Sequence, residues 1–168
     1  TLFEKRQSIS VRFERFDLDD GDFIDIASTP PTAGPILLLL HGLEGSIESP
    51  YARGTLHAAA QKGWQGILMH FRGCSGPVNR TLIGYHSGET EDLLQFLKHL
   101  RQQNPNKPIL AAGFSLGGNV LLKYLGESQD EALIDAAVAV SVPYSLRECS
   151  KQIHKGTSRL YGRMLLNS

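Results

Sequence analysis

The sequence predicts an α/β fold, in which a mostly parallel sheet carries helices on both faces and follows an N-terminal β-hairpin. Two features indicate this fold. From Pro35 onward, short apolar segments alternate with helical segments, whereas the residues before Pro35 show the two-residue periodicity of paired strands. The chain has 168 residues, of which 41% are hydrophobic and 20% charged, so one domain can bury a core without disulfides.

Composition and charge exclude several classes of protein. The 17 basic and 17 acidic side chains cancel, so nothing marks a surface for nucleic acid or anionic lipid. The longest apolar run, 36–40, is too short to span a bilayer, and no secretory signal opens the sequence. Cys74 and Cys149 form neither a disulfide framework nor a zinc motif. We therefore expect a reduced, soluble, cytoplasmic protein without a nucleic-acid partner; its oligomeric state stays open.

The N-terminal segments predict a hairpin and then a buried strand. Residues 8–16 alternate between polar and apolar side chains, which is typical of a half-buried strand whose apolar face holds Ile9, Val11 and Phe13. The Asp20–Gly21 pair suits a hairpin turn before a second strand over 23–27. Residues 35–40 are apolar throughout, as expected for a strand covered on both faces.

The rest of the chain alternates helices and strands. Ser49–Pro50 and Gly63 are typical of the start and end of one helix. The segments after it predict, in order, a strand over 66–71, a helix over 90–103, a strand over 108–112, a helix ending near 126 and a strand over 136–142. The connection over 72–89 is long, and long connections in compact domains are often functional.

The most informative motif is G-x-S-x-G, formed by residues 113–117 between an apolar strand and a helix. A turn this sharp forces the serine into strained backbone angles and needs small neighbours. The strain pushes the Ser115 hydroxyl out over the sheet, at a helix start that favours developing negative charge. Ser115 is thus the candidate nucleophile. The alternative is a glycine-rich turn that only lets a helix pack closely on the sheet.

A second motif, His41-Gly42-Leu43, follows the first parallel strand. It should emerge at the carboxyl edge of the sheet, the same edge as Ser115, where ligands bind in such folds. The backbone N–H groups of Leu43 and Leu116 are therefore the candidates for holding an oxyanion. An ordinary turn after a strand is the alternative interpretation.

Five segments in this order, HGLEGSIESPY, MHFRGCSG, YHSGETEDL, GFSLGGN and DAAVAVSVP, resemble the YheT-type branch of the α/β-hydrolase superfamily. That branch groups esterase-like proteins with the embryogenesis-associated proteins of plants and with lipid-acting hydrolases of animals. The resemblance covers essentially the whole chain. It implies an α/β-hydrolase fold and carboxylic ester hydrolysis by a serine, an acid and a histidine, with Ser115 as the serine and Gly42–Leu43 as the oxyanion loop.

The resemblance places the acid and the histidine beyond residue 168. Asp135 and His154 follow the serine in the right order, but Asp135 precedes its strand and should lie roughly 20 Å from the Ser115 edge. Glu148 and His154 are a weaker substitute pair. The strand over 136–142 is apolar on both faces and should have a further strand beside it. The first residues contain no leader signal. The last residues follow an apolar helical stretch over 160–166 and contain no capping signal. We expect residues 1–168 to be the N-terminal portion of a single α/β-hydrolase domain.

The expected activity is cleavage of small-molecule or lipid carboxylic esters through an acyl-enzyme on Ser115, without a metal or organic cofactor. Residues 1–168 alone should be inactive because the base is missing. Two alternatives stay open: a thioesterase, amidase or acyltransferase with the same nucleophile, and an inactive hydrolase fold used as a binding or scaffold module. The other candidate residues are interpreted as structural, although His70 and His86 could also shape the pocket. These residues are His57, His70, His86, His99, Cys74 and the acidic group Glu89, Glu91 and Asp92.

Overall fold

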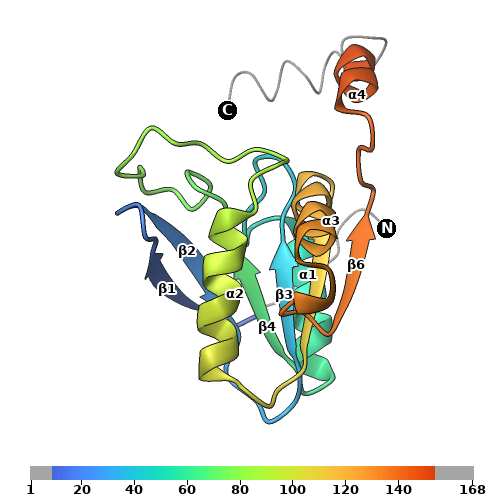
Figure 1. The fold of residues 1–168 in the computed structure, drawn as a ribbon. Coiled ribbons are helices and arrows are strands. Elements are labelled where there is room, and N and C mark those ends of the chain that lie inside the picture. Colours follow the sequence, from blue (N-terminus) through green and yellow to red (C-terminus); the bar gives the residue numbers. More distant parts are fainter. Residues whose placement is uncertain (1–8, 154–168) are drawn as a thin grey trace.

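The computed structural model describes residues 9–153, so His154 and the stretch over 160–166 lie outside it. Six strands form one sheet in the order β1-β2-β4-β3-β5-β6 (Figure 1). The strands are β1 (Arg12–Asp17), β2 (Phe23–Ser28), β3 (Ile36–Leu40), β4 (Gln65–Met69), β5 (Ile109–Phe114) and β6 (Ala136–Val140). The helices are α1 (Pro50–Gln61), α2 (Glu91–Gln103), α3 (Leu116–Ser128) and α4 (Leu146–Ile153), with a 3-10 turn at Gln129–Glu131. The predicted α/β architecture and its element order are confirmed.

The N-terminal hairpin forms as expected, and Ile9 and Val11 of its expected apolar face pack against the core on the α1 side of the sheet. β1 and β2 pair antiparallel around a turn in which Gly21 has φ +83°, a conformation that glycine adopts without a steric penalty. The strand starts only at Arg12, and Phe13 is 59% exposed. Phe16 packs against Phe96 of α2 instead. The expected apolar face was therefore wrong at Phe13, which lies on an edge strand of the sheet and is left largely exposed.

The parallel strands form the centre of the molecule. β3 lies between β4 and β5 and pairs parallel with both. Its alternate side chains enter two cores: Leu38 and Leu40 pack with α2 and α3, whereas Leu39 packs with α1 on the other face. Helix α1 begins at Ser49–Pro50 as predicted and ends just before Gly63, which has φ +72°. Within residues 9–153, no helix has both the length and the apolar character needed to cross a bilayer.

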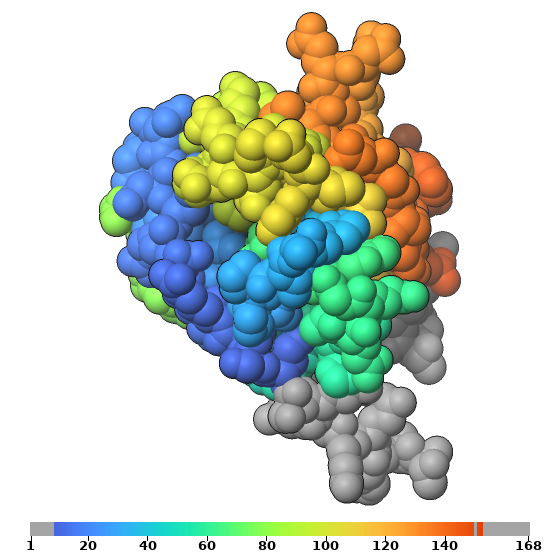
Figure 2. Space-filling view, turned by 90° about the horizontal axis from the view of Figure 1, so that it is seen from below, coloured from blue at the N-terminus to red at the C-terminus, as the bar shows by residue number. Residues whose placement is uncertain are grey.

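β6 pairs parallel with β5 and is an edge strand of the described sheet. Its outer side is open, and Val138 is 54% exposed. The expected second neighbour is not present among residues 9–153. At the start of β6, Asp135 accepts a 2.7 Å hydrogen bond from the Ile109 amide, which places it at the amino edge as predicted. Figure 2 views that edge, on which the open end of the hairpin (blue), the end of α1 (green) and the α2–β5 connection (yellow) are all exposed.

The long connection between β4 and α2 is held by a buried ionic network centred on Arg72, which is 7% exposed. Its guanidinium makes two hydrogen bonds to the Asp92 carboxylate, at 2.8 and 2.6 Å, and a 2.6 Å bond to Asp20. The fully buried Asp22 carboxylate accepts hydrogen bonds from residues 79–81 farther along the connection. Because of these bonds, a segment without helix or strand has a fixed course above the carboxyl ends of the strands.

Candidate active site

Ser115 occupies a strained turn between β5 and α3. Its φ of 52° and ψ of −114° lie in a region that costs a non-glycine residue of order 1–3 kcal/mol. The surrounding structure holds the turn at both ends, since the Ser115 amide donates a 2.8 Å hydrogen bond to Val140 of β6 and its carbonyl accepts from Gly118 and Asn119. The serine is therefore presented above the sheet, at the first turn of a helix, as the G-x-S-x-G motif predicts.

The glycines of the motif are required by close backbone contacts. A Cβ on Gly117 would lie 2.4 Å from the His41 carbonyl oxygen and 2.5 Å from that of Leu40. A Cβ on Gly113 would lie 2.5 Å from the Gly117 carbonyl oxygen. The start of α3 can thus rest directly on the end of β3, and this contact brings the loop after β3 to the side of Ser115.

Replacing Gly117 by alanine is expected to destabilise the protein by about 2 to 3 kcal/mol, because the new Cβ meets backbone atoms that cannot move aside. Chemical unfolding of the complete protein measures this change. Gly126 in the same helix is the matched control. Apart from the backbone of α3 itself, no atom of the described residues lies within 4 Å of the position that its Cβ would take. Gly126→Ala should therefore stabilise the helix by about 0.5 to 1 kcal/mol. Equal effects at the two positions would contradict the close contact.

In the part of the chain that the structure describes, the loop after β3 has one backbone amide without a hydrogen-bond partner. From Gly42 to Ser49, each backbone N–H other than that of Leu43 donates a hydrogen bond within the described structure. The Leu116 amide also has no partner among residues 9–153. A Cβ on Gly42 would lie 3.3 Å from the Ser115 Cβ, so the loop runs immediately beside the serine. The two amides expected to bind an oxyanion are thus unpaired within the described part of the chain and flank Ser115.

His41 fixes the peptide that carries the Leu43 amide. Its Nδ1–H donates to the Gly42 carbonyl at 2.7 Å, and its Nε2 accepts from the Phe71 amide at 3.0 Å. The Gly45 amide donates to the same carbonyl at 3.0 Å. Because a trans peptide is planar, holding the Gly42 C=O also fixes the direction of the Leu43 N–H. In the sequence, His41 stands out only as part of the HG motif, and nothing there signals this role.

Acidification from pH 6.5 to 4 is expected to destabilise the protein, because two buried histidines are neutral in the fold. Burial lowers the pKa of His41 from 6.5 to about 4, and burial also lowers the pKa of His70. In this window the unfolded chain binds more protons than the folded one, so the free energy of unfolding decreases as the pH is lowered. The decrease at pH 4 is about 3 kcal/mol for His41 alone.

Urea unfolding of the complete protein, followed by circular dichroism at several pH values, measures this loss. A His41→Gln variant removes one of the two buried neutral rings, so it should lose less stability than the wild type over the same pH range. A free energy of unfolding that stays constant between pH 6.5 and 4 would contradict the buried neutral rings.

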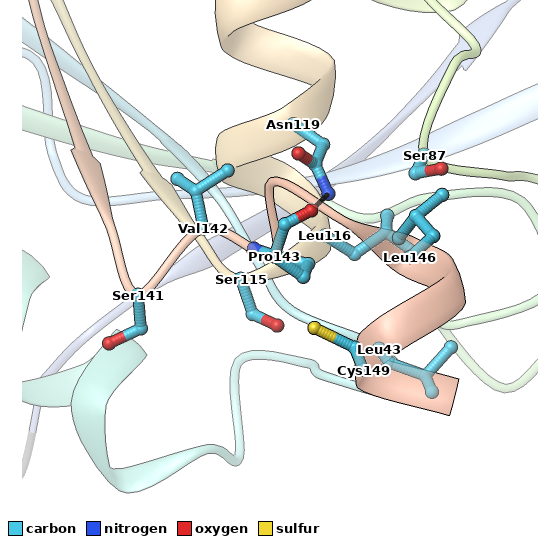
Figure 3. Close-up of a pocket in the computed structure, with 10 residues that line it drawn as sticks. All are labelled: Leu43, Ser87, Ser115, Leu116, Asn119, Ser141, Val142, Pro143, Leu146 and Cys149. Carbon is cyan, nitrogen blue, oxygen red and sulfur yellow. Dashed lines mark hydrogen bonds between the residues drawn. The ribbon is translucent and has the colours of Figure 1, made fainter. Parts of the chain in front are cut away.

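A pocket of about 680 Å³ opens beside the serine. Figure 3 shows the Ser115 hydroxyl turned into it, with Leu43 and Leu116 nearby and Leu146 and Cys149 contributed by α4. Its lining is mainly apolar and includes no histidine or carboxylate of the described residues. Among the lining residues, Ser87, Asn119 and Pro143 belong to segments that carry the family resemblance. The sequence indicated no role for them in the pocket, because they approach Ser115 only in the folded chain.

The other candidate residues lie elsewhere. His70 is buried away from the pocket and accepts from the Ile47 amide, and His86 is exposed and accepts from the Gly88 amide. Neither lines the pocket, so neither shapes it directly. His57 lies half-buried on α1, and His99 is exposed beside Phe16. Burial raises the pKa of the Cys74 thiol, which keeps it protonated.

The acidic residues have structural partners. Glu89 accepts from the Glu91 amide at the start of α2, as expected, but Asp92 is buried and pairs with Arg72, which the sequence did not indicate. Asp135 pairs with Arg101 at the amino edge, and Glu148 is exposed and pairs with Lys151. His154 lies outside the described residues, so its pairing with Glu148 stays a prediction.

A strained serine at the carboxyl edge of a parallel sheet, beside two amides that are unpaired among residues 9–153, is typical of one class of protein. Residues 35–167 match the family described as alpha/beta hydrolase fold. The chain belongs to the α/β-hydrolase family. It is 47% identical to the protein named "Putative esterase YheT" of Escherichia coli over 99% of this chain, which confirms the YheT-type resemblance. The chain spans 50% of that relative's length.

Two further relatives are consistent with this family. The monoacylglycerol lipase of Saccharomyces cerevisiae is 35% identical over 68% of this chain, which corresponds to 26% of the yeast protein. The solved structure of the Pyrococcus furiosus esterase Pf2001 has a TM-score of 0.72 and 22% identity, and the likeness covers 94% of this chain and 61% of that one. At this identity the structural likeness shows the fold alone.

Proposed function

We propose that the chain carries the nucleophile and the oxyanion-binding groups of a serine hydrolase that cleaves carboxylic esters. The proposal rests on the proximity of Ser115, strained and turned into a pocket, to the amides of Leu43 and Leu116, which have no hydrogen-bond partner among residues 9–153. Free amides directed at a developing negative charge are the main source of catalysis in acyl transfer, at about 3 kcal/mol for each donor.

The reaction is a two-step acyl transfer. The Ser115 oxygen attacks the ester carbonyl while a histidine takes its proton, and the carbonyl oxygen becomes an oxyanion bound by the two amides. The C–O bond to the alcohol then breaks, and the alcohol leaves with that proton. Water attacks the acyl-serine in the same way, giving the acid and free Ser115. The chain's own residues require no metal or organic cofactor for these steps.

The acid and the histidine are assigned to a region outside residues 1–168, so residues 1–168 form the N-terminal portion of a single hydrolase domain. Three observations support this. No histidine or carboxylate among residues 9–153 lines the pocket, and the E. coli relative is about twice as long as this chain. The open, apolar side of β6 is also where a further strand of the sheet would pair.

The pocket favours an apolar acyl group. The pocket beside Ser115 is lined by Leu43, Val142, Pro143 and Leu146, and two of the relatives are named esterase and monoacylglycerol lipase. We therefore assign short- to medium-chain or lipid esters as the substrate class.

Hydrolysis of a panel of esters, thioesters and amides of graded acyl length by the complete protein tests the proposal. Turnover of esters above thioesters and amides is expected. Preferential cleavage of thioesters, or transfer of the acyl group to an added alcohol, would identify the same nucleophile with another bond or acceptor. A complete protein that neither turns over the panel nor reacts with a fluorophosphonate would instead be a binding module built on a hydrolase fold.

A further inference from the structure

The long connection after β4 supplies a tyrosine whose hydroxyl is hydrogen-bonded to the proposed oxyanion loop. The Tyr85 hydroxyl accepts a 3.0 Å hydrogen bond from the Glu44 amide and donates a 2.9 Å hydrogen bond to the Glu44 carboxylate. Both atoms belong to the residue that directly follows Leu43. Burial raises the pKa of the Tyr85 hydroxyl, so it stays a proton donor at any physiological pH.

Glu44 needs such a partner because its backbone is strained. Its φ of 51° lies in the left-handed region, which a residue with a side chain adopts only where contacts hold it. On the other side of Leu43, the Gly42 amide donates to the Tyr51 hydroxyl at 2.9 Å. The two tyrosines therefore occupy the amides that flank Leu43, and the Leu43 N–H is left as the loop's free donor beside Ser115.

Tyr85 is itself held in place. Its ring stacks on Phe71 with centroids 5.3 Å apart and an angle of 5° between the ring planes. Upstream in the same connection, Asn79, Arg80 and Thr81 all donate hydrogen bonds to the buried Asp22. The hydroxyl thus reaches Glu44 from a support built on the sheet and the hairpin, and not from a free loop.

We propose that Tyr85 is a positioning residue, which sets the Leu43 amide for the oxyanion by holding Glu44. This inference rests on the proposed hydrolase function. Without the hydroxyl, Glu44 loses both hydrogen bonds and its strained backbone relaxes, so the Leu43 N–H turns away from the position where negative charge develops. Such a displacement weakens binding of the transition state more than binding of the substrate.

The test compares Tyr85→Phe with Tyr124→Phe in the complete protein. Tyr124 is the matched control, because its hydroxyl also accepts a 2.9 Å hydrogen bond from a backbone amide, that of Leu133, but in the core away from Ser115. Three quantities are measured: kcat and KM for the best ester, the inhibition constant of a trifluoromethyl ketone with the same acyl chain, and hydrogen exchange of residues 42–49.

Tyr85→Phe should lower kcat about 10- to 100-fold with KM within threefold, and should weaken the ketone by a similar factor. Amide exchange over 42–49 should also accelerate. Tyr124→Phe should change none of these. If the wild type is active and Tyr85→Phe keeps kcat within twofold, or if both variants lose activity equally, the role of Tyr85 is overturned. If the wild type itself neither turns over esters nor is labelled at Ser115, the hydrolase assignment fails and the catalytic role of Tyr85 fails with it.

Discussion

Replacement of Ser115 by alanine in the complete protein should lower kcat for esters by about 10⁴- to 10⁶-fold, because it removes the oxygen that forms the acyl-enzyme. Covalent labelling by a fluorophosphonate should disappear at the same time. The free energy of unfolding should change little, since alanine has the same Cβ and meets the same backbone strain at φ 52°. The measurements are initial rates on the best ester and mass spectrometry of the labelled protein.

The stability of a Ser115→Gly variant provides a second readout. Glycine adopts positive φ without a penalty, so this variant should be inactive yet about 1 kcal/mol more stable than the wild type. Ser128, at the far end of α3, is the control, and Ser128→Ala should keep full activity and labelling. Labelling that persists in Ser115→Ala would show that the reactive group is elsewhere, with Cys149 in the same pocket as the first residue to examine.

Replacement of Arg72 by methionine should destabilise the protein by about 3 to 5 kcal/mol. Asp92 is 2% exposed, and Arg72 is its partner in a pair of charge-assisted hydrogen bonds, so the variant leaves a buried carboxylate without compensation. The loss of the Arg72 guanidinium should destabilise the buried Asp22 carboxylate less than that of Asp92. Burial by itself would raise the pKa of Asp22, but hydrogen bonds from Thr81, Arg80 and Asn79 more than offset burial and lower it below the usual range. Chemical unfolding at pH 7 measures the loss.

Two further variants separate the lost ion pair from lost packing. Arg72→Lys keeps the charge but lacks the planar fork that bonds both Asp92 oxygens, so it should fall between wild type and Arg72→Met. Removing both charges, in Arg72→Met with Asp92→Leu, should recover much of the stability because no unpaired charge stays buried. A loss below 1 kcal/mol in Arg72→Met would show that the pair is solvated.

Most of the element order could be predicted from the sequence, because hydrophobic periodicity and glycine or proline turns act over a few residues. The helix start at Ser49–Pro50 and the turn at Gly21 are examples. The errors arose where burial depends on distant neighbours. Phe13 alternates like a core residue, but it lies on an edge strand that no helix covers on that side. In the sequence, Asp92 is typical of the first turn of a helix. In the structure it is buried, and its partner Arg72 follows β4, 20 residues earlier in the chain.

The same distinction holds for the candidate site. The two turns, at 41–43 and 113–117, and the edge of the sheet at which both emerge could be predicted from local patterns, since parallel strands end on one side. Which amide of the first turn stays free depends on packing between distant parts of the chain. Its neighbours are occupied by hydroxyls from separate elements, Tyr85 being 41 residues away along the chain, and hydrogen bonds over such distances depend on how the folded chain packs.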